Sequence, residues 1–237
     1  MYFFCEETIF LYLICRIISN FNLCPYRLLD QTFLFQGAGG AAVGIANLLV
    51  AAMMKLEGAA VEEARERIWM RDIKGLVVKE RSSGGITEQM QPFAHDHGTE
   101  VEDLSEAVKV LQPTVLIGAA GVRGAFTPEI IQDMAKFNKN PIIMALSNPT
   151  SVAECSAEEA YSNSEGRAIF ASGSPFPPYL GFGRELHSSQ SNNAYVYPGI
   201  CLGVLSAGLH HVPDSVFLTA AEVLAGAVTE EELAEGR

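Results

Sequence analysis

Hydrophobic and polar residues alternate along the chain in blocks that predict strands and helices in turn. Short apolar runs are typical of strands that are buried on both faces of a sheet. The strands that we expect are 32–36, 68–71, 114–117, 141–146 and 168–171. Between them, apolar residues recur every three or four positions, which is the spacing of a helix. We expect helices at 41–56, 61–67, 101–111, 128–136, 157–161, 199–209 and 215–228.

This regular succession of strands and helices predicts an α/β fold. A strand–helix–strand repeat builds a parallel sheet, and strands that are apolar on both faces need helices to cover each side. We therefore expect a Rossmann-like, doubly wound parallel sheet with helices on both faces over residues 31–237. In such a sheet, ligands bind outside the carboxyl ends of the strands.

Residues 1–30 differ from the rest of the chain. Their apolar run, Ile9–Cys15, is interrupted by Arg16 and is too short for a membrane span, which needs about 20 apolar residues. Glu6 and Glu7 stand where a signal peptide would carry basic residues. We expect a divergent segment without an assignable function, followed by the folded domain from residue 31.

The composition is that of a globular protein, and it limits the partners. Of the 237 residues 49% are apolar, and 16 Lys and Arg face 28 Asp and Glu, a formal net charge of −12. Nucleic acids and anionic membranes both favour a basic face, so we expect neither as a partner. The five cysteines form no CxxC pair, which favours free thiols in a reducing compartment. His95 and His97 lie in a polar stretch that we interpret as a solvated loop.

A glycine-rich turn follows the first expected strand. The run Gly-Ala-Gly-Gly-Ala-Ala at 37–42 opens a helix and matches the G-x-G-x-x-A pattern of dinucleotide-binding folds. Gly37 would allow the tight turn, Gly39 would let the backbone approach a pyrophosphate, and Ala42 would keep helix and strand close. The unpaired N–H groups of the helix start would then bind phosphate. The alternative is a tight turn without a ligand.

Asp72 follows the second strand and is our candidate for binding a ribose hydroxyl. It lies further from Gly37 than the ~20 residues of the simple fingerprint, because a second helix, 61–67, is inserted between them. The alternative is a surface carboxylate that pairs with Arg71 or Lys74. Lys74 can also meet the 2′-phosphate of NADP, whereas Asp72 favours the free 2′-hydroxyl of NAD. We lean towards NADP.

Three further strand ends carry small or amide side chains. Their sequences are Gly-Ala-Ala-Gly at 118–121, Ser-Asn-Pro-Thr at 147–150 and Ser-Gly-Ser-Pro at 172–175. Because these ends meet at one edge of a parallel sheet, they would form a floor that a flat cofactor can approach. The cofactor-binding residues that we expect are Gly37, Ala38, Gly39, Gly40, Ala42, Asp72, Lys74, Gly118, Ala119, Ala120 and Asn148.

Several long motifs resemble the NAD(P)-binding domain of the malic enzymes. They are Gly-Ala-Gly-Gly-Ala-Ala-Val-Gly-Ile-Ala at 37–46, Ser-Asn-Pro-Thr-Ser at 147–151, Ala-Glu-Cys-Ser-Ala-Glu-Glu-Ala-Tyr at 153–161, Gly-Arg-Ala-Ile-Phe-Ala-Ser-Gly-Ser-Pro-Phe at 166–176, Gln-Ser-Asn-Asn-Ala-Tyr at 190–195 and Glu-Glu-Leu-Ala-Glu-Gly-Arg at 231–237. The resemblance covers about 31–237, in the family's order.

The resemblance implies oxidative decarboxylation of malate to pyruvate and carbon dioxide, with NAD or NADP as the cofactor and Mg or Mn as the metal. It also implies a homo-oligomer in the intact enzyme and an intracellular location, cytoplasmic or mitochondrial. Asn148, Asn192 and Asn193 would bind the substrate carboxylate beside the nicotinamide, since an amide donates and accepts hydrogen bonds without adding charge. From the residues alone, turn chemistry explains these asparagines equally well.

The chain also departs from the family's pattern. Gly40 stands where the family usually has an acid, Arg123 falls in a loop of small residues, and Ser-Ser-Gln-Ser at 188–191 replaces Pro-Gly-Gln-Gly. The family's base lysine, acid tyrosine and metal carboxylates precede the glycine turn, and nothing in 1–30 resembles that sequence. The chain also stops before the family's C-terminal helices.

We therefore assign no catalytic residue and no metal ligand to this chain. The expectation is a malic-enzyme cofactor domain that lacks the groups for the chemistry. The alternative is a non-catalytic NAD(P)-binding module, or a regulatory partner of a full-length malic enzyme.

Overall fold

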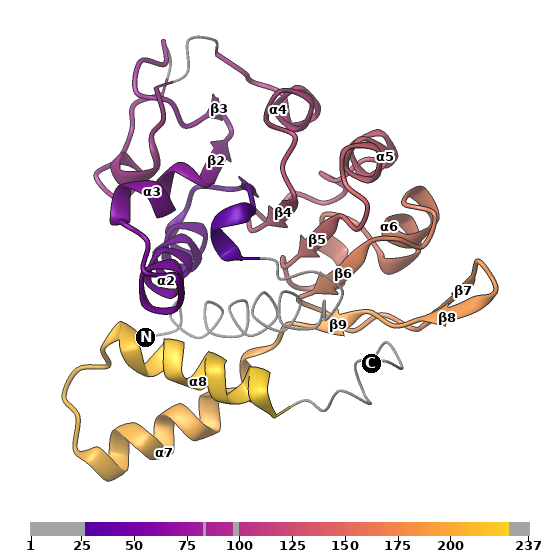
Figure 1. The fold of residues 1–237 in the computed structure, drawn as a ribbon. Helices are drawn as coiled ribbons and strands as arrows, with labels where there is room; N and C mark the ends of the chain where they lie inside the picture. Colours follow the sequence, from indigo (N-terminus) through magenta and orange to yellow (C-terminus); the bar gives the residue numbers. More distant parts are fainter. Residues whose placement is uncertain (1–26, 83, 97–99, 228–237) are drawn as a thin grey trace.

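The computed structural model of the protein describes residues 27–82, 84–96 and 100–227. Four predictions lie outside the described residues: the apolar run at 9–15, His97, the end of the last helix at 228, and the motif at 231–237. The described residues form a seven-stranded sheet that is covered by helices on both faces (Figure 1).

The strands of the main sheet are all short. Their bounds are β1 Phe33–Gln36, β2 Ile68–Asp72, β3 Gly75–Leu76, β4 Val115–Gly118, β5 Ile142–Ala145, β6 Ile169–Ser172 and β9 Ser189–Gln190. They lie in the order β3-β2-β1-β4-β5-β6-β9, and every pair is parallel except β2 with β3. Because the order reverses at β1, the topological switch point lies where β1 ends. A separate hairpin pairs β7 Tyr179–Gly181 with β8 Arg184–Leu186.

Helices lie in most of the connections between the parallel strands, and two further helices follow the last strand. They are α2 Gly40–Glu57, α3 Val61–Glu66, α4 Leu104–Leu111, α5 Pro128–Phe137, α6 Ala157–Asn163, α7 Tyr197–Ala207 and α8 Asp214–Gly226, with short 3-10 turns η1 Leu28–Asp30, η2 Gln91–Phe93, η3 Thr150–Val152 and η4 Asn193–Tyr195. Local sequence sets several of these ends. The Thr127 side chain caps α5, Ser156 and Glu159 form a capping box on α6, and Gly58 ends α2 in the left-handed conformation.

Each central strand contributes to two cores, because successive side chains of a strand point to opposite faces of the sheet. Phe33 and Phe35 pack in the core that includes α2, α7 and α8, whereas Leu34 between them packs in the core that includes α4, α5 and α6. The doubly wound α/β fold predicted from the sequence is therefore confirmed.

The helix α2 is long and apolar enough to cross a membrane by length and composition alone. Half of its residues are nevertheless buried inside the fold. Near its C-terminal end, Lys55 pairs with Glu222 of α8 at 2.8 Å. We interpret α2 as the core helix that connects β1 to α3 and β2.

Residues just before 31 also pack against the domain. Leu28 and Leu29 in η1 are buried, and their N–H groups donate to the Glu57 carboxylate at the end of α2, at 2.5 and 3.0 Å. The η1 turn is therefore fixed against the C-terminal end of α2 by these two hydrogen bonds.

The prediction of a solvated loop is wrong for His95. Its ring stacks on Trp69 with ring centroids 3.7 Å apart, and its Nε2 lies 2.7 Å from the Ile68 carbonyl oxygen. The polar neighbours of His95 in sequence conceal this contact, because it depends on the segment after β3 returning alongside β2.

Candidate functional site

The glycine turn lies at the topological switch point of the sheet. Gly37 packs between the carboxyl ends of β2 and β4. Gly37 donates its N–H to the Arg71 carbonyl oxygen at 2.8 Å, and Ala119 donates to the Gln36 carbonyl oxygen at 3.0 Å. Gly37 has a φ of 128°, and a Cβ at this position would lie 2.9 Å from the Ala119 carbonyl oxygen. Only glycine fits here, because a side chain would be strained and would push the β1 and β4 ends apart.

The next glycine opens the start of α2 towards solvent. Gly39 is the N-cap residue of α2 and has ordinary extended backbone angles, φ −79° and ψ −177°. A Cβ at Gly39 would meet no heavy atom of the described residues within 4 Å. Gly39 and Gly40 are exposed, whereas Ala38 and Ala42 are buried beneath them. The first N–H groups of an 18-residue helix therefore lie behind open space, which suits a phosphate.

At the end of β2, the Asp72 carboxylate is held by an arginine. Arg81 donates from both terminal nitrogens, to Oδ1 at 2.9 Å and Oδ2 at 2.8 Å, and the Lys74 backbone N–H donates to Oδ1 at 2.8 Å. Arg71 contacts Gln36 and the Glu102 carbonyl oxygen instead. The side chain that pairs with Asp72 is thus Arg81, and neither Arg71 nor Lys74 pairs with it through a side chain.

The Lys74 side chain remains available to a ligand. It is exposed, and among the described residues no carboxylate forms an ion pair with its ammonium group. Its stem lies over Gly84, where an added Cβ would be 2.5 Å from the Lys74 Cγ. A lysine in this position beside the Asp72 carboxylate can meet a phosphate on the ribose that Asp72 is predicted to bind.

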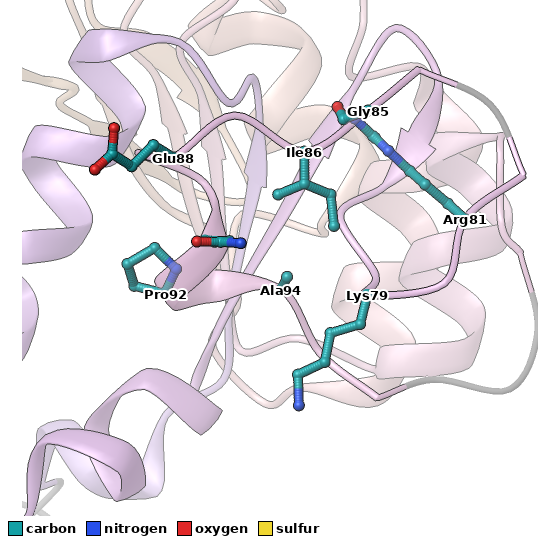
Figure 2. A pocket seen from close by; sticks show the side chains of 8 residues that line it. Lys79, Arg81, Gly85, Ile86, Glu88, Pro92 and Ala94 are labelled. Carbon is teal, nitrogen blue, oxygen red and sulfur yellow. The ribbon is translucent and has the colours of Figure 1, made fainter.

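A pocket of about 670 Å³ adjoins the Asp72–Arg81 pair (Figure 2). It is lined by Lys79, Arg81, Gly85, Ile86, Glu88, Gln91, Pro92 and Ala94. Figure 2 shows the Arg81 side chain running towards Gly85, whose carbonyl oxygen accepts from a terminal nitrogen of Arg81 at 2.8 Å. The Arg81 side chain is 4% exposed, and its Nε lacks a hydrogen-bond partner among the described residues. The predicted ribose end of the site therefore holds a buried donor that no described residue satisfies.

On the other side of β1, the ends of β4, β5 and β6 form a connected polar floor. Gly121 donates its N–H to the Ser147 Oγ at 2.9 Å, and the Ser174 hydroxyl donates to the Asn148 Oδ1 at 2.7 Å. A Cβ at Gly173 would lie 2.5 Å from the Asn148 Nδ2, so the amide packs directly on this backbone. Gly118 is buried, Ala119 is half-buried and Ala120 is exposed.

The asparagine pair follows β9 at the same edge of the sheet. β9 pairs in parallel with β6, and Ser191 donates to the Ser172 carbonyl oxygen at 2.7 Å. Asn192 is half-buried, and its Oδ1 accepts from the Ala194 N–H at 3.0 Å. Asn193 begins η4, and its side chain lies outside the described residues. Asn148 follows β5 and Asn192 follows β9, so both lie at the carboxyl edge of the sheet, and their role in substrate binding stays a prediction.

Glu154 is a polar residue of this region that the sequence analysis did not single out. Its side chain is fully buried at 0% exposure and contacts Ser147 below the floor. Burial raises the pKa of the Glu154 carboxyl above its ordinary value, although the hydrogen bonds from Ser147 act in the opposite direction. Glu154 lies in the family-like motif 153–161, but nothing in its local sequence signals that a carboxylate would turn inward there.

The described residues do not supply a metal site. No group of three or more His, Cys, Asp or Glu side chains among them could hold an ion, and hard ions such as Mg or Mn require several oxygen ligands. Of the cysteines in the described ranges, Cys155 and Cys201 are both free thiols.

The fold and the glycine turn define the class of protein. A parallel sheet whose central strand leads through a glycine turn into an open helix start is the architecture of dinucleotide-binding domains. The family is more specific: residues 12–237 match the model described as the malic enzyme NAD binding domain, and the chain belongs to that family. The predicted resemblance is confirmed.

Known proteins agree with this assignment. The chain is 56% identical over 225 residues to the NADP-dependent malic enzyme of Columba livia, covering 94% of this chain and 40% of that protein. It is 49% identical to the mitochondrial NADP-dependent malic enzyme of Homo sapiens, covering 94% of this chain and 37% of that protein. The chain therefore spans about 40% of the length of these curated relatives.

A solved structure shows the same fold. The crystal structure of Entamoeba histolytica malic enzyme superposes with a TM-score of 0.67 at 22% sequence identity, covering 92% of this chain and 40% of that one. At this identity the similarity supports the architecture of the domain.

Proposed function

We propose that this chain forms the NADP site of a malic enzyme. The observation that carries the proposal is the open N-terminus of α2 behind Gly39, at the switch point of the sheet. The pyrophosphate would bind to the backbone of Gly37–Gly40, with Ala42 allowing the close packing of α2 on the sheet.

The ribose end favours NADP over NAD. Asp72 would bind a ribose hydroxyl, and the exposed ammonium group of Lys74 would meet the 2′-phosphate. The relatives reported above carry the description NADP-dependent, which supports the same choice.

The nicotinamide half would lie over Gly118, Ala119, Ala120 and Asn148. A bound dinucleotide would supply the hydride acceptor for the C2 carbon of malate, while the loss of the hydroxyl proton, the loss of carbon dioxide and the protonation of the resulting enol would need acid–base groups that we do not assign here. Asn148, Asn192 and Asn193 would orient the malate carboxylate by donating amide hydrogen bonds. None of these amides can remove a proton at neutral pH, so their role is binding and orientation.

The remaining family properties are proposals for the intact protein. Mg or Mn would need carboxylate ligands beyond the described residues, and no catalytic residue is assigned within them. A homo-oligomer and a cytoplasmic or mitochondrial location follow only by analogy with the relatives. The second candidate function is a non-catalytic NAD(P)-binding module or a regulatory partner of a full-length malic enzyme.

Calorimetric titration of the purified full chain with NADP and with NAD tests the proposal. We expect saturable binding of both, with NADP the tighter ligand, and competition by ADP-ribose that carries a 2′-phosphate. If a folded sample binds neither dinucleotide, the glycine turn has only a structural role and the proposed function is wrong.

A further inference from the structure

Glu154 is a buried carboxylate that the proposed cofactor contacts leave unexplained. It lies between η3 and α6, just after β5, and its side chain is fully buried. No lysine, arginine or histidine within the described ranges forms an ion pair with it. A buried charge without a cationic partner lowers the stability of a fold, so its presence needs a reason.

Burial raises the pKa of the Glu154 carboxyl, and the hydrogen bonds around it act against this effect by favouring the ionised carboxylate. Ser147 donates its N–H to Oε2 at 3.3 Å, and its hydroxyl donates to Oε1. The Ser147 Oγ in turn accepts the Gly121 N–H, which leaves its own proton free for Glu154. Both contacts from Ser147 therefore supply a hydrogen to the carboxylate, the arrangement that stabilises the charged form.

The carboxylate lies directly under the floor of the site. A Cβ at Gly118 would overlap the Glu154 carboxyl group, so the glycine at the end of β4 leaves the space that this group fills. The hydrogen bond from Gly121 to Ser147 continues the contact into the loop after β4. One negative charge is thus held against the backbone at the ends of β4 and β5.

This half of the sheet edge is where the nicotinamide would lie. In a doubly wound sheet the two halves of a dinucleotide lie on either side of the switch point. Asp72 and Arg81 at the end of β2 mark the adenosine side, which leaves the ends of β4 and β5 for the nicotinamide. The oxidised ring carries a positive charge that the reduced ring lacks.

We propose that Glu154 is a positioning residue that makes the site favour the oxidised dinucleotide over the reduced one. This inference rests on the proposed dinucleotide binding. The buried negative charge stabilises the cationic ring from below, and the bound ring supplies a compensating charge that no described side chain supplies. The preference also favours release of the cofactor after reduction.

A purely structural role is the competing explanation. In that case Glu154 only connects Ser147 to the segment before α6 by hydrogen bonds. Its replacement would then weaken the binding of NADP and of NADPH equally. The ratio of the two dissociation constants separates the explanations, because a general loosening of the site cancels in the ratio.

The experiment compares Glu154→Gln with the wild-type full chain, using NADP and NADPH as probes in calorimetric titrations. In the wild type we expect NADP to bind more tightly than NADPH. In Glu154→Gln we expect this ratio to fall by roughly fivefold or more, the order of effect of one unit charge in a partly dry site. Glu158→Gln is the matched control, because it removes the same charge from an exposed position in the first turn of α6. This variant should keep the wild-type ratio of the two dissociation constants.

Three results would overturn the inference: wild-type chain that binds NADPH as tightly as NADP, an unchanged ratio in Glu154→Gln, or an equal fall in Glu158→Gln. Glu154→Asp keeps the charge and should retain most of the preference, which provides a test if the glutamine variant does not fold. A wild-type chain that binds neither form would instead refute the proposed function itself.

Discussion

Arg81 donates hydrogen bonds to both oxygens of the Asp72 carboxylate, at 2.9 and 2.8 Å. The Arg81 side chain is 4% exposed and the Asp72 side chain is 18% exposed. A planar guanidinium matches a carboxylate in this two-pronged geometry, which fixes the orientation of the acid. The acid predicted to bind the ribose is thus held in place before any ligand arrives. Its Oδ1 also accepts the Lys74 N–H, which ties the next loop to the same group.

Replacing Asp72 should weaken dinucleotide binding. In Asp72→Ala, the ribose hydroxyl loses its acceptor and Arg81 loses its partner, so we expect NAD affinity to fall by ~1–3 kcal/mol. Titration calorimetry measures the change. Asp214→Ala, which removes an exposed carboxylate from the start of α8, is the control and should bind as the wild type does. Equal affinity in Asp72→Ala and the wild type would place the ribose elsewhere.

Lys74 should select between the two cofactors. Lys74→Ala removes a cation that can meet only the 2′-phosphate, so NADP affinity should fall by roughly tenfold, or about 1.4 kcal/mol, while NAD affinity stays the same. Lys139→Ala, at an exposed position after α5, should alter neither. Equal losses for NAD and NADP in Lys74→Ala would contradict a role in phosphate recognition.

Gly37 should matter for stability before it matters for binding. A methyl group at Gly37 would meet the Ala119 carbonyl oxygen at 2.9 Å while the backbone keeps a φ of 128°. We expect Gly37→Ala to lower the free energy of unfolding by roughly 2–4 kcal/mol. Gly58→Ala, also at positive φ but without a described atom within 4 Å of its Cβ, should cost only about 1 kcal/mol. Urea unfolding of both variants checks the difference; similar losses would show that the close approach is unimportant.

Elements with strong local signals could be predicted from the sequence. β1, β4 and β5 could be recognised as strands because both of their faces are buried, and the starts of α5 and α6 carry their own capping side chains. The expected bounds of these elements differ from the observed ones by a few residues at most. By contrast, β3, β9 and the β7–β8 hairpin were missed, because such short strands exist through pairing with distant segments.

The candidate site divides in the same way. The glycine turn could be predicted because its pattern is local and each position has a steric reason. Arg81 and Glu154 could not, since their roles depend on a loop that folds back to Asp72 and on a carboxylate that turns inward under Gly118. Nothing in the neighbouring residues distinguishes these two from solvated charges.

We predict that the chain alone does not oxidise malate at a measurable rate. Asn148 and Asn192 can orient a substrate but cannot remove a proton at neutral pH, and general acid–base catalysis typically contributes roughly 10²–10⁴-fold to a rate. The test follows the absorbance of reduced nicotinamide with malate, NADP and Mn, with a full-length malic enzyme as the positive control. Metal-dependent turnover by this chain would show that it contains the acid–base groups that we did not assign.

The most direct test of the central claim, that the turn between β1 and α2 binds the dinucleotide pyrophosphate, is titration of Gly39→Ala with NADP beside the wild-type chain. The backbone angles of Gly39 suit alanine, and the added methyl would meet no described atom of the protein within 4 Å. The variant should therefore unfold at the wild-type temperature, but the methyl should block the approach of the pyrophosphate and reduce NADP affinity at least tenfold. A stable Gly39→Ala chain that binds NADP as tightly as the wild type would contradict the account.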